Sequence, residues 1–255
     1  MLNLDLSGQI ALVTGGSGEL GRVMCRTLAD CGAAVAVHYF QAREKAERVV
    51  AGIRENGGRA EAFQGDVSLA SDVHKLRAEV ADKLGSPRII VTNAVSQVQW
   101  KNLLDQNPED YENQFRTCVL QNVLMAQTFV PDIIASNQGG RIIAINTECA
   151  MQNFVTQSAY VSGKRGMDGV LRVLAKEVGE HGITVNQVAP GWTESDRIRE
   201  MEGDPQAGYA ASVPLRRVGT DQEIANVVAF LASDLAAFIT GAYVPVCGGN
   251  VMPAI

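Results

Sequence analysis

Short apolar runs alternate with amphipathic stretches along almost the whole 255-residue chain. Most of the runs are four or five residues long and rich in Val and Ile, which is typical of strands buried on both faces of a parallel sheet. The stretches between them repeat apolar residues at spacings of three and four, which is the pattern of helices with one buried face. The predicted strands are Ile10–Val13, Ala34–His38, Ala60–Gln64, Ile89–Thr92, Ile142–Asn146, Thr184–Val188 and Tyr243–Val246.

Several of the predicted helices have recognisable ends. Ser71 is a good N-terminal cap for a helix that continues to Leu84, and Gly85 is a good terminator. The pair Asn107-Pro108 predicts the start of a long helix toward Asn137, which Pro131 should kink. The other predicted helices are Ala42–Glu55, Gln157–Glu180 and Asp221–Leu231.

Seven strands with about six crossover helices predict an α/β fold, a Rossmann-type doubly wound parallel sheet. We expect residues 1–255 to form one dinucleotide-binding catalytic domain. The segment from Trp192 to Thr220 has no strand pattern and is rich in Gly and Pro. Because long loops in compact domains are usually lids or binding loops, this segment is the predicted substrate loop.

Composition excludes several classes of protein. Hydrophobic residues make up 46% and charged residues 20%, as in ordinary globular proteins, and the net charge of −6 argues against nucleic acids or anionic membranes as partners. The five cysteines are an odd number without a Cys-x-x-Cys pair, which favours reduced thiols and no metal site. The N-terminus lacks a signal-peptide pattern, and the longest apolar run, Val227–Ala232, is too short to span a bilayer. We therefore expect a cytoplasmic protein that acts on a small molecule.

A glycine-rich turn follows the first predicted strand directly. It reads Thr14-Gly-Gly-Ser-Gly-Glu-Leu-Gly21 and leads into a predicted helix. Glycines in this position allow backbone amides to approach a pyrophosphate, and the helix N-terminus adds further amides and its dipole. A glycine turn without a ligand is the structural alternative, but the strand–turn–helix context favours a dinucleotide site.

The end of the second strand bears on the choice of cofactor. NAD-binding folds usually have an acidic residue there for the ribose 2′-hydroxyl, but this strand runs from Val37 to Tyr39 and on to Arg43 without a carboxylate. An uncharged strand end near Arg43 favours NADP over NAD. Arg43 could equally be a solvated charge on the following helix.

Tyr160 and Lys164 form the most informative pair of residues. They are four positions apart near the start of the helix that follows the fifth strand, so both can point into one site. A nearby ammonium stabilises phenolate, which predicts a lowered pKa for Tyr160 and a proton donor suited to carbonyl reduction. Such pairs are usually exposed, but this helix starts at the carboxyl ends of the strands, where open α/β folds bind ligands.

Taken together, these motifs resemble the short-chain dehydrogenase/reductase family over essentially the whole chain. The motifs that carry the resemblance are Thr14-Gly15 to Gly21, Asp66-Val67, Asn93-Ala94, Tyr160-x-x-x-Lys164 and Pro190-Gly191. The segment from Thr240 to Gly249 is most similar to 3-oxoacyl-(acyl-carrier-protein) reductase-like members. Members are commonly tetramers in which two long helices pack between subunits, so the resemblance implies a homotetramer.

The resemblance also implies roles for individual residues. Tyr160 would be the general acid/base, and Lys164 would hold the nicotinamide ribose and lower the pKa of Tyr160. Thr147 would hydrogen-bond the substrate oxygen. The candidate cofactor-binding residues are Gly15, Ser17, Gly18, Leu20, Gly21, Tyr39, Arg43, Asp66, Val67, Asn93, Ala94, Pro190, Gly191 and Thr193.

Four positions depart from the family pattern. Thr147 replaces the usual serine, and Glu19 brings a carboxylate near the expected pyrophosphate. Val95 replaces a glycine where the backbone passes the cofactor, and Cys118 aligns with an asparagine that supports a water relay to the lysine. Asn122, one turn later, is the candidate substitute for that asparagine.

These observations predict an NADP(H)-dependent oxidoreductase that moves hydride between nicotinamide and a ketone or secondary alcohol, with a 3-oxoacyl compound as one possible substrate. Glu19, Val95 and Cys118 motivate one alternative, a nucleotide-binding homologue with weak or no turnover. Two others are an NAD-dependent alcohol or sugar dehydrogenase and another reaction on the same cofactor, such as epimerisation or dehydration.

The predicted wall of the substrate pocket mixes apolar and amide side chains. Without an arginine cluster it disfavours a small dicarboxylate, but it leaves acyl thioesters, sugars, cyclic ketones and steroids open. Glu148, beside Thr147, either reaches the substrate site or is solvated. Arg197 and Arg199 in the loop could meet a phosphate of a carrier or remain surface charges. The predicted wall consists of Val95, Gln97, Gln152, Phe154, Trp192 and parts of Thr193–Val213.

Overall fold

The computed structural model describes residues 4–194 and 207–252. Within them, one parallel sheet has the strand order β3-β2-β1-β4-β5-β6-β7. This arrangement confirms the predicted doubly wound Rossmann-type fold. Four strands have the predicted bounds, β2 and β6 are longer, and β5 begins two residues earlier and ends one residue earlier than predicted. The strands are β1 (Ile10–Val13), β2 (Ala34–Tyr39), β3 (Ala60–Gln64), β4 (Ile89–Thr92), β5 (Gly140–Ile145), β6 (Ile183–Pro190) and β7 (Tyr243–Val246).

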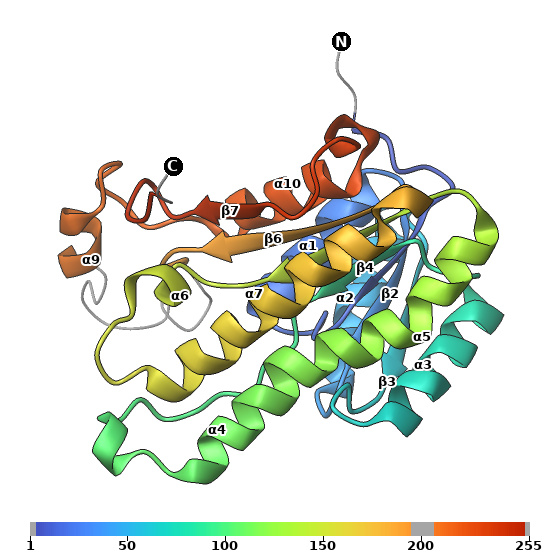
Figure 1. Cartoon of the computed structure of the whole chain (residues 1–255). Helices are drawn as coiled ribbons and strands as arrows, with labels where there is room; N and C mark the ends of the chain where they lie inside the picture. The colour runs from blue at the N-terminus through green and yellow to red at the C-terminus, as the bar shows by residue number, and fades with distance from the viewer. Residues whose placement is uncertain (1–3, 195–206, 253–255) are drawn as a thin grey trace.

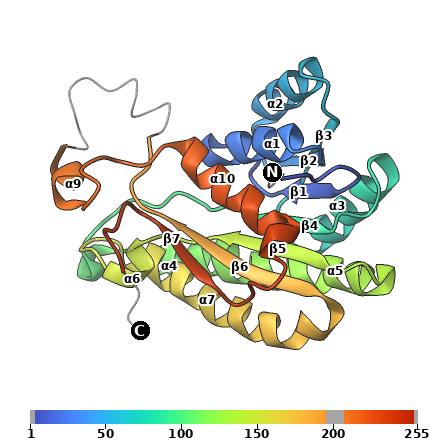
Figure 2. The same ribbon diagram turned by 90° about the horizontal axis from the view of Figure 1, so that it is seen from above.

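Helices cover both faces of the sheet (Figures 1 and 2). One face carries α1 (Glu19–Asp30), α2 (Arg43–Glu55) and α10 (Asp221–Ala232), and the other carries α3 (Ala70–Lys83), α5 (Gln121–Ser136) and α7 (Ser158–Val178). Successive strand residues point to opposite faces, so Leu12 packs in one apolar core while its neighbour Val13 packs in the other. The strands are therefore buried on both faces, which is why they are short, continuous apolar runs in the sequence.

The helix ends follow local chemistry, with one correction to the prediction. Gly85 ends α3 with a φ of +103°, as its position after the helix requires. Ser71 is not the cap of α3, because the helix already begins at Ala70 and Leu69 takes the capping position. The turn before α3 is instead closed by the Asp72 carboxylate, which accepts the backbone N–H of Asp66 at 2.9 Å.

The predicted long helix is present but has an irregular segment. It comprises α4 (Pro108–Gln114), a π-helical segment (η2, Phe115–Leu120) and α5, which continues past Pro131 to Ser136. Its 29 residues are long and apolar enough to cross a membrane. However, half of its most apolar window is buried within the fold, and a core helix passes the same test.

The predicted substrate loop contains secondary structure that the sequence pattern does not reveal. A short helix, α9 (Ala207–Ser212), lies in it, and Thr193 forms an isolated bridge with Gly219. Residues 195–206, which include Arg197 and Arg199, lie outside the described residues. The other short helices of the described residues are α6 (Cys149–Gln152), η1 (Leu103–Asp105), η3 (Gly179–His181) and η4 (Asp234–Ala236).

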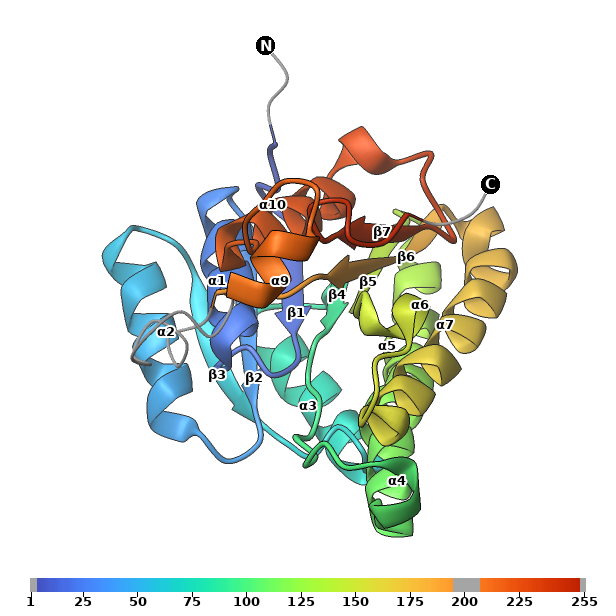
Figure 3. The same cartoon turned by 90° about the vertical axis from the view of Figure 1, so that its left-hand side faces the viewer.

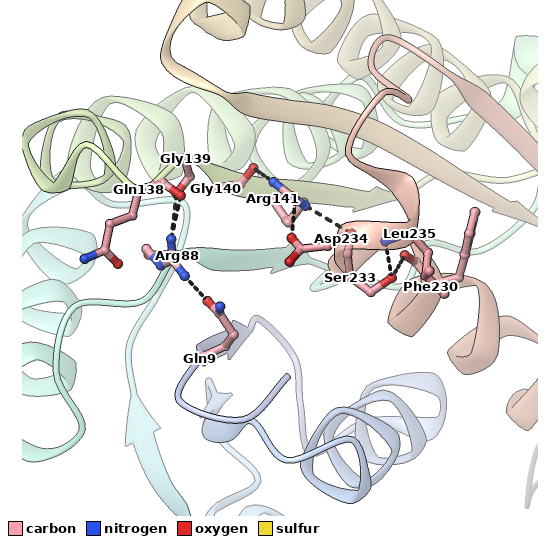
Figure 4. A network of polar contacts seen from close by, with 10 residues as sticks. All are labelled: Gln9, Arg88, Gln138, Gly139, Gly140, Arg141, Phe230, Ser233, Asp234 and Leu235. Carbon is pink, nitrogen blue, oxygen red and sulfur yellow. Dashed lines mark hydrogen bonds and ion pairs between the residues drawn. The ribbon is translucent and has the colours of Figure 1, made fainter. Parts of the chain in front are cut away.

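Two arginines fix the amino ends of the central strands (Figure 4). Arg88, just before β4, donates to Gln9 Oε1 at 2.5 Å and to the Gln138 carbonyl at 2.6 Å. Arg141, in β5, donates to the Asp234 carboxylate at 2.9 Å, which ties the sheet to the segment after α10. These contacts link neighbouring segments at the amino ends of the strands, which is the end of the sheet opposite the predicted site.

Candidate active site

The strand order reverses between β1 and β4, and ligands of open α/β sheets bind at the carboxyl ends beside such a reversal. Figure 3 shows this end of the molecule, with α6 and α9 in front. Two adjoining cavities lie there. One, of about 650 Å³, borders the glycine turn after β1, and the other, of about 450 Å³, borders Tyr160 and Thr147.

The glycine turn requires its glycines for space and for backbone conformation. Gly15 has a φ of +62°, and a Cβ there would lie 3.0 Å from the Ala94 Cα. A Cβ on Gly21 would lie only 2.1 Å from the Gly15 carbonyl oxygen, so α1 packs directly under the turn. Gly18 provides no side-chain cap for α1, and the first amides of the helix are therefore close to the larger cavity.

His38 holds the turn from the second strand, a role that the sequence did not suggest. Its Nδ1 accepts the Gly15 N–H at 3.1 Å, and its Nε2 lies 3.1 Å from the Gly65 carbonyl. These partners need a neutral ring with the proton on Nε2. Burial lowers the pKa of His38 from 6.5 to about 4, against the opposing effects of the Gly65 bond and of Asp66.

Thr14 and Asn93 join the ends of β1 and β4. The Thr14 hydroxyl accepts the backbone N–H groups of Asn93 and Ala94 at 2.9 and 3.0 Å and donates to Gln121 Oε1 at 2.6 Å. The Asn93 amide donates to the Thr14 and Gly15 carbonyls at 3.0 and 3.2 Å. These bonds fix the backbone at the point where the two strands separate.

The structure gathers most of the predicted cofactor residues around the two cavities. Tyr39 is an exception, because its side chain is buried in the apolar core. Arg43 does not line the larger cavity either, and its guanidinium pairs with Glu47 at 3.7 Å on the surface. The larger cavity is lined by Gly15, Ser17, Gly18, Leu20, Asp66, Val67, Asn93 and Ala94, and the smaller by Pro190, Gly191 and Thr193.

These cavities fit a dinucleotide. The larger one has the glycine turn and the uncapped start of α1 on one side, which suits a pyrophosphate. Val95, Ser96 and Gln97 line both cavities, so the two form one continuous region from the glycine turn to Tyr160. Val95 is thus accommodated at the boundary between them, while Glu19, at the first turn of α1, is exposed and also lines the larger cavity.

Thr147, Tyr160 and Lys164 meet beside the smaller cavity. The Lys164 ammonium donates to the Ile145 carbonyl at 2.6 Å and lies 5.9 Å from the centre of the Tyr160 ring. Thr147 lies two residues after the end of β5, and its carbonyl accepts a hydrogen bond from the Tyr243 hydroxyl on β7. Asn146 positions the strand end, because its side chain donates to the Lys164 carbonyl at 3.2 Å and accepts the Thr147 N–H at 2.9 Å.

The pKa of Tyr160 is raised, which corrects the prediction that it is lowered. Burial is the main cause, and a hydrogen bond with the Thr147 side chain opposes it only in part. Burial also lowers the pKa of Lys164, whose ammonium binds a backbone carbonyl instead of the phenol. In the protein alone, burial of the phenolate therefore outweighs its stabilisation by the lysine.

Cys118 and Asn122, the two positions compared with the family's asparagine, have different surroundings. Cys118 is buried in the π-helical segment, close enough to Lys164 for the charge of each to affect the pKa of the other. The Asn122 amide donates to the Cys118 carbonyl at 2.6 Å, and its carbonyl oxygen accepts the Thr92 hydroxyl at 2.6 Å. The side chain of Asn122 therefore supports the helix and β4, and no contact of it with Lys164 is found among the described residues.

The smaller cavity has a mostly apolar and amide wall, as predicted. Val95, Gln97, Phe154 and Trp192 line it, but Gln152 does not, because its amide donates to the Asn250 carbonyl at 2.9 Å. The structure adds residues that the sequence did not place there. These are Ser96, Val98, Trp100, Cys149, Val155, Thr156 and Gln157, together with Glu148, whose position the sequence left open, whereas Thr193 and Tyr209 come from the predicted range Thr193–Val213.

Comparison with known proteins agrees with this geometry. A family profile described as enoyl-(acyl carrier protein) reductase matches residues 17–250. The 3-oxoacyl-(acyl-carrier-protein) reductase FabG of Escherichia coli is 37% identical over 250 residues, which cover 98% of this chain and all of that protein. The enzyme of the same name from Staphylococcus epidermidis is 35% identical over 252 residues, with 95% of this chain and 98% of that protein covered.

Solved structures show the same fold. The promiscuous reductase LugOII, which catalyses keto-reduction at C1 during lugdunomycin biosynthesis, superposes with a TM-score of 0.88 at 32% identity, covering 97% of this chain and 99% of that one. A blue fluorescent protein from a metagenomic library, solved in complex with NADPH, has a TM-score of 0.88 at 30% identity, covering 97% and 100%. With these matches over nearly its whole length, the chain belongs to the short-chain dehydrogenase/reductase family and is an NAD(P)-dependent oxidoreductase.

Proposed function

We propose that the protein reduces ketones to secondary alcohols, and catalyses the reverse reaction, with NADP(H) as cofactor and Tyr160 as general acid/base. The observation that carries this proposal is the meeting of Thr147, Tyr160 and Lys164 at the smaller cavity, which adjoins the cavity at the glycine turn. When bound, the cofactor supplies or accepts the hydride.

The roles of the three side chains follow from their positions. In reduction, the Tyr160 hydroxyl donates its proton to the carbonyl oxygen as the carbonyl carbon gains hydride, so ketone, hydride and proton give the alcohol. The Thr147 hydroxyl hydrogen-bonds the same oxygen and orients it. The Lys164 ammonium binds the Ile145 carbonyl and thereby fixes the end of β5 beside the Tyr160 ring.

The raised pKa of Tyr160 favours the direction of reduction. A raised pKa keeps the phenol protonated at neutral pH, and the protonated form is the one that donates in reduction. Oxidation of the alcohol needs the deprotonated form, so its rate should rise toward alkaline pH.

Two features support NADP. The end of the larger cavity near β2 is formed by His38, Phe40, Gln41 and Ala42, without a carboxylate for a ribose 2′-hydroxyl. Beside Ser17 and Gly18, a neighbouring cavity is lined by basic side chains of α1 and α2, which suit a 2′-phosphate. These basic residues are Arg22, Arg26, Lys45 and Arg48, which outnumber the single carboxylate of that lining, Glu19.

The similarity to 3-oxoacyl-(acyl-carrier-protein) reductases makes a 3-oxoacyl compound a candidate substrate. We expect the protein to act in the cytoplasm as a homotetramer. Exposed residues on the long helix, among them Phe115 with 51% of its surface accessible, support packing of that helix against another subunit.

The test is Tyr160→Phe, with Tyr111→Phe on α4 as the control, because the Tyr111 hydroxyl bonds Ser158 Oγ at 2.7 Å and neither residue lines the smaller cavity. Oxidation of NADPH is followed at 340 nm with a panel of neutral ketones and 3-oxo esters. We expect Tyr160→Phe to lower kcat by about a thousandfold, within the range of general acid catalysis, and Tyr111→Phe to leave it unchanged. Full activity in Tyr160→Phe would disprove the mechanism, and NADPH binding without any turnover in the wild type would favour the nucleotide-binding homologue.

A further inference from the structure

Glu148 is an acidic residue in an unusual position for a pocket that accepts a carbonyl compound. It follows Thr147 directly and lines the same cavity as Tyr160, yet only 3% of its surface is accessible. Buried carboxylates are rare unless they are paired or hydrogen-bonded. Its partners therefore indicate why it is tolerated there.

Glu148 accepts hydrogen bonds from two segments that are distant in the sequence. Its Oε2 accepts the Tyr209 hydroxyl of α9 at 3.0 Å and the Asn250 amide at 2.9 Å. The Tyr209 oxygen itself accepts the Trp192 N–H at 3.0 Å, so its proton is available for Glu148. Burial raises the pKa of Glu148, while the hydrogen bonds from Tyr209 and Asn250 to its Oε2 oppose that rise and stabilise the ionised carboxylate.

No cation among the described residues balances this charge within the cavity. Glu148 is the one acidic side chain in the described lining, and that lining contains no Lys, Arg or His. The aromatic side chains of Trp100, Phe154 and Trp192 make up much of the rest. In the sequence, residues 195–206 contain two arginines and four carboxylates, so that segment adds no excess of positive charge.

We propose that Glu148 determines substrate specificity by charge, so that the pocket accepts neutral and cationic keto compounds and rejects those that carry a carboxylate near the ketone. The reason is that a substrate carboxylate would enter a partly desolvated cavity that already contains a buried negative charge. At a separation of about 8 Å and an effective dielectric constant of about 20, such repulsion weakens binding by about tenfold or more.

This inference rests on the proposed function and narrows its substrate class. Esters and thioesters of 3-oxo acids are neutral at the reacting end, so the pocket would accept them, whereas the free 3-oxo acids would be excluded. A cation on the substrate would be attracted by Glu148 and by the faces of the neighbouring aromatic rings.

The experiment uses three ligands with one scaffold: ethyl 4-oxocyclohexanecarboxylate (neutral), 4-oxocyclohexanecarboxylate (anionic) and 4-(dimethylamino)cyclohexanone (cationic). The two tryptophans of the protein, Trp100 and Trp192, both line the cavity, so intrinsic fluorescence reports binding without turnover. Dissociation constants are measured at pH 7.5 in the presence of NADP for the wild type, Glu148→Gln and the control Glu177→Gln. Glu177 is an exposed carboxylate on α7 and is not part of the cavity.

In the wild type we expect the anion to bind at least about tenfold more weakly than the ester, and the cation at least as tightly. In Glu148→Gln the ratio of anion to ester affinity should rise by about tenfold, while Glu177→Gln should keep the wild-type ratio. The ratio of anion to ester affinity is compared because a general effect of the substitution on the pocket changes both affinities equally and cancels in the ratio.

Equal binding of anion and ester by the wild type, an unchanged ratio in Glu148→Gln, or no binding of any of the three ligands would overturn the proposal. If Glu148→Gln does not fold, the wild-type order of anion, ester and cation still decides it. Charge-dependent binding without turnover of the ester would leave this inference standing and count against the proposed function alone.

Discussion

The two cavities of the active site are held together by different kinds of contact. Around the glycine turn, side chains bind backbone groups: the His38 ring accepts the Gly15 N–H, and the Thr14 hydroxyl accepts the N–H groups of Asn93 and Ala94. Around the smaller cavity, side chains from distant segments bond to one another, as Glu148 does with Tyr209 and Asn250. In the first region, buried side chains hold a closely packed backbone that forms the site, whereas in the second the site is formed by side chains bonded to one another.

This difference suggests how each region responds to substitution. A site formed by packed backbone loses its shape when a new side chain clashes with a neighbouring segment, because that backbone cannot move aside. A site shaped by side chains loses individual hydrogen bonds and changes in specificity while the fold persists. Substitutions in the two regions should therefore affect cofactor binding and substrate binding separately.

The largest effect is expected for Gly21→Ala. The added Cβ would lie 2.1 Å from the Gly15 carbonyl oxygen, so the turn or α1 must shift. Overpacking of this kind destabilises a protein by about 1–3 kcal/mol, and we expect NADPH affinity to fall by at least about tenfold. Urea unfolding and isothermal titration with NADPH measure the two effects.

Gly52→Ala is the control for this substitution. Gly52 lies inside α2, and a Cβ there would meet nothing within 4 Å. The helix propensity of alanine should raise the free energy of unfolding by about 0.5–1 kcal/mol without a change in NADPH affinity. Unchanged NADPH affinity in Gly21→Ala would contradict a site shaped by backbone packing.

His38 should make the cofactor region sensitive to acid. Its pKa is lowered to about 4 in the folded protein against 6.5 for the ordinary side chain, so the unfolded state binds more protons between these values. The stability that His38 contributes is thus complete above pH 6.5 and is lost as pH falls toward 4, by about 3 kcal/mol in total. Urea unfolding at several pH values measures this loss.

His38→Leu should lower the free energy of unfolding at pH 7 by about 1–3 kcal/mol, because Gly15 N–H and the Gly65 carbonyl lose their partner. It should also flatten the dependence of stability on pH between 6.5 and 4. The control, His74→Gln, changes an exposed histidine of α3 and should keep the wild-type profile. A His38→Leu profile as steep as that of the wild type would rule out this role.

The sequence predicts the cofactor region better than the substrate region, for a physical reason. Buried parallel strands such as β1 and β4 have strong apolar signals, and Gly15 and Gly21 occupy positions where only glycine fits. These local constraints are visible in a single sequence. They also fix the topology, since the crossover rule leaves few arrangements of the strands.

Contacts between distant segments leave no comparable local signal. Tyr209 and Asn250 meet Glu148 only because α9 and the C-terminal segment fold back over α6, and neither residue lies in a periodic pattern. The pKa of Tyr160 was mispredicted for a related reason. The i, i+4 spacing places Lys164 correctly, but the extent of burial depends on the whole fold.

In the substrate region, Tyr209→Phe removes a single hydroxyl that joins α9 to Glu148 and to the Trp192 N–H. We expect KM for a neutral ketone to rise about three- to tenfold, in keeping with the loss of one hydrogen bond to a charged group. The Kd for NADPH should stay within about twofold of the wild-type value. Steady-state kinetics measures KM for the ketone and titration measures Kd for NADPH, with Tyr111→Phe as the control. A weakened NADPH affinity with an unchanged KM for the ketone would contradict the separation of the two regions.

The smallest effect is expected for Arg43→Ala, which tests whether an exposed side chain also contributes to cofactor binding. Arg43 and Glu47 form an exposed i, i+4 pair at 3.7 Å, and such pairs contribute little to stability, so Arg43 is free to exchange Glu47 for a 2′-phosphate. We expect KM for NADPH to rise about threefold and KM for NADH to stay constant. Lys75→Ala, which breaks the equally exposed pair with Glu79 at 3.7 Å on α3, should change neither value. If Arg43→Ala also changes neither, the 2′-phosphate must be held elsewhere, and Lys45 and Arg48 of the neighbouring basic cavity become the residues to substitute next.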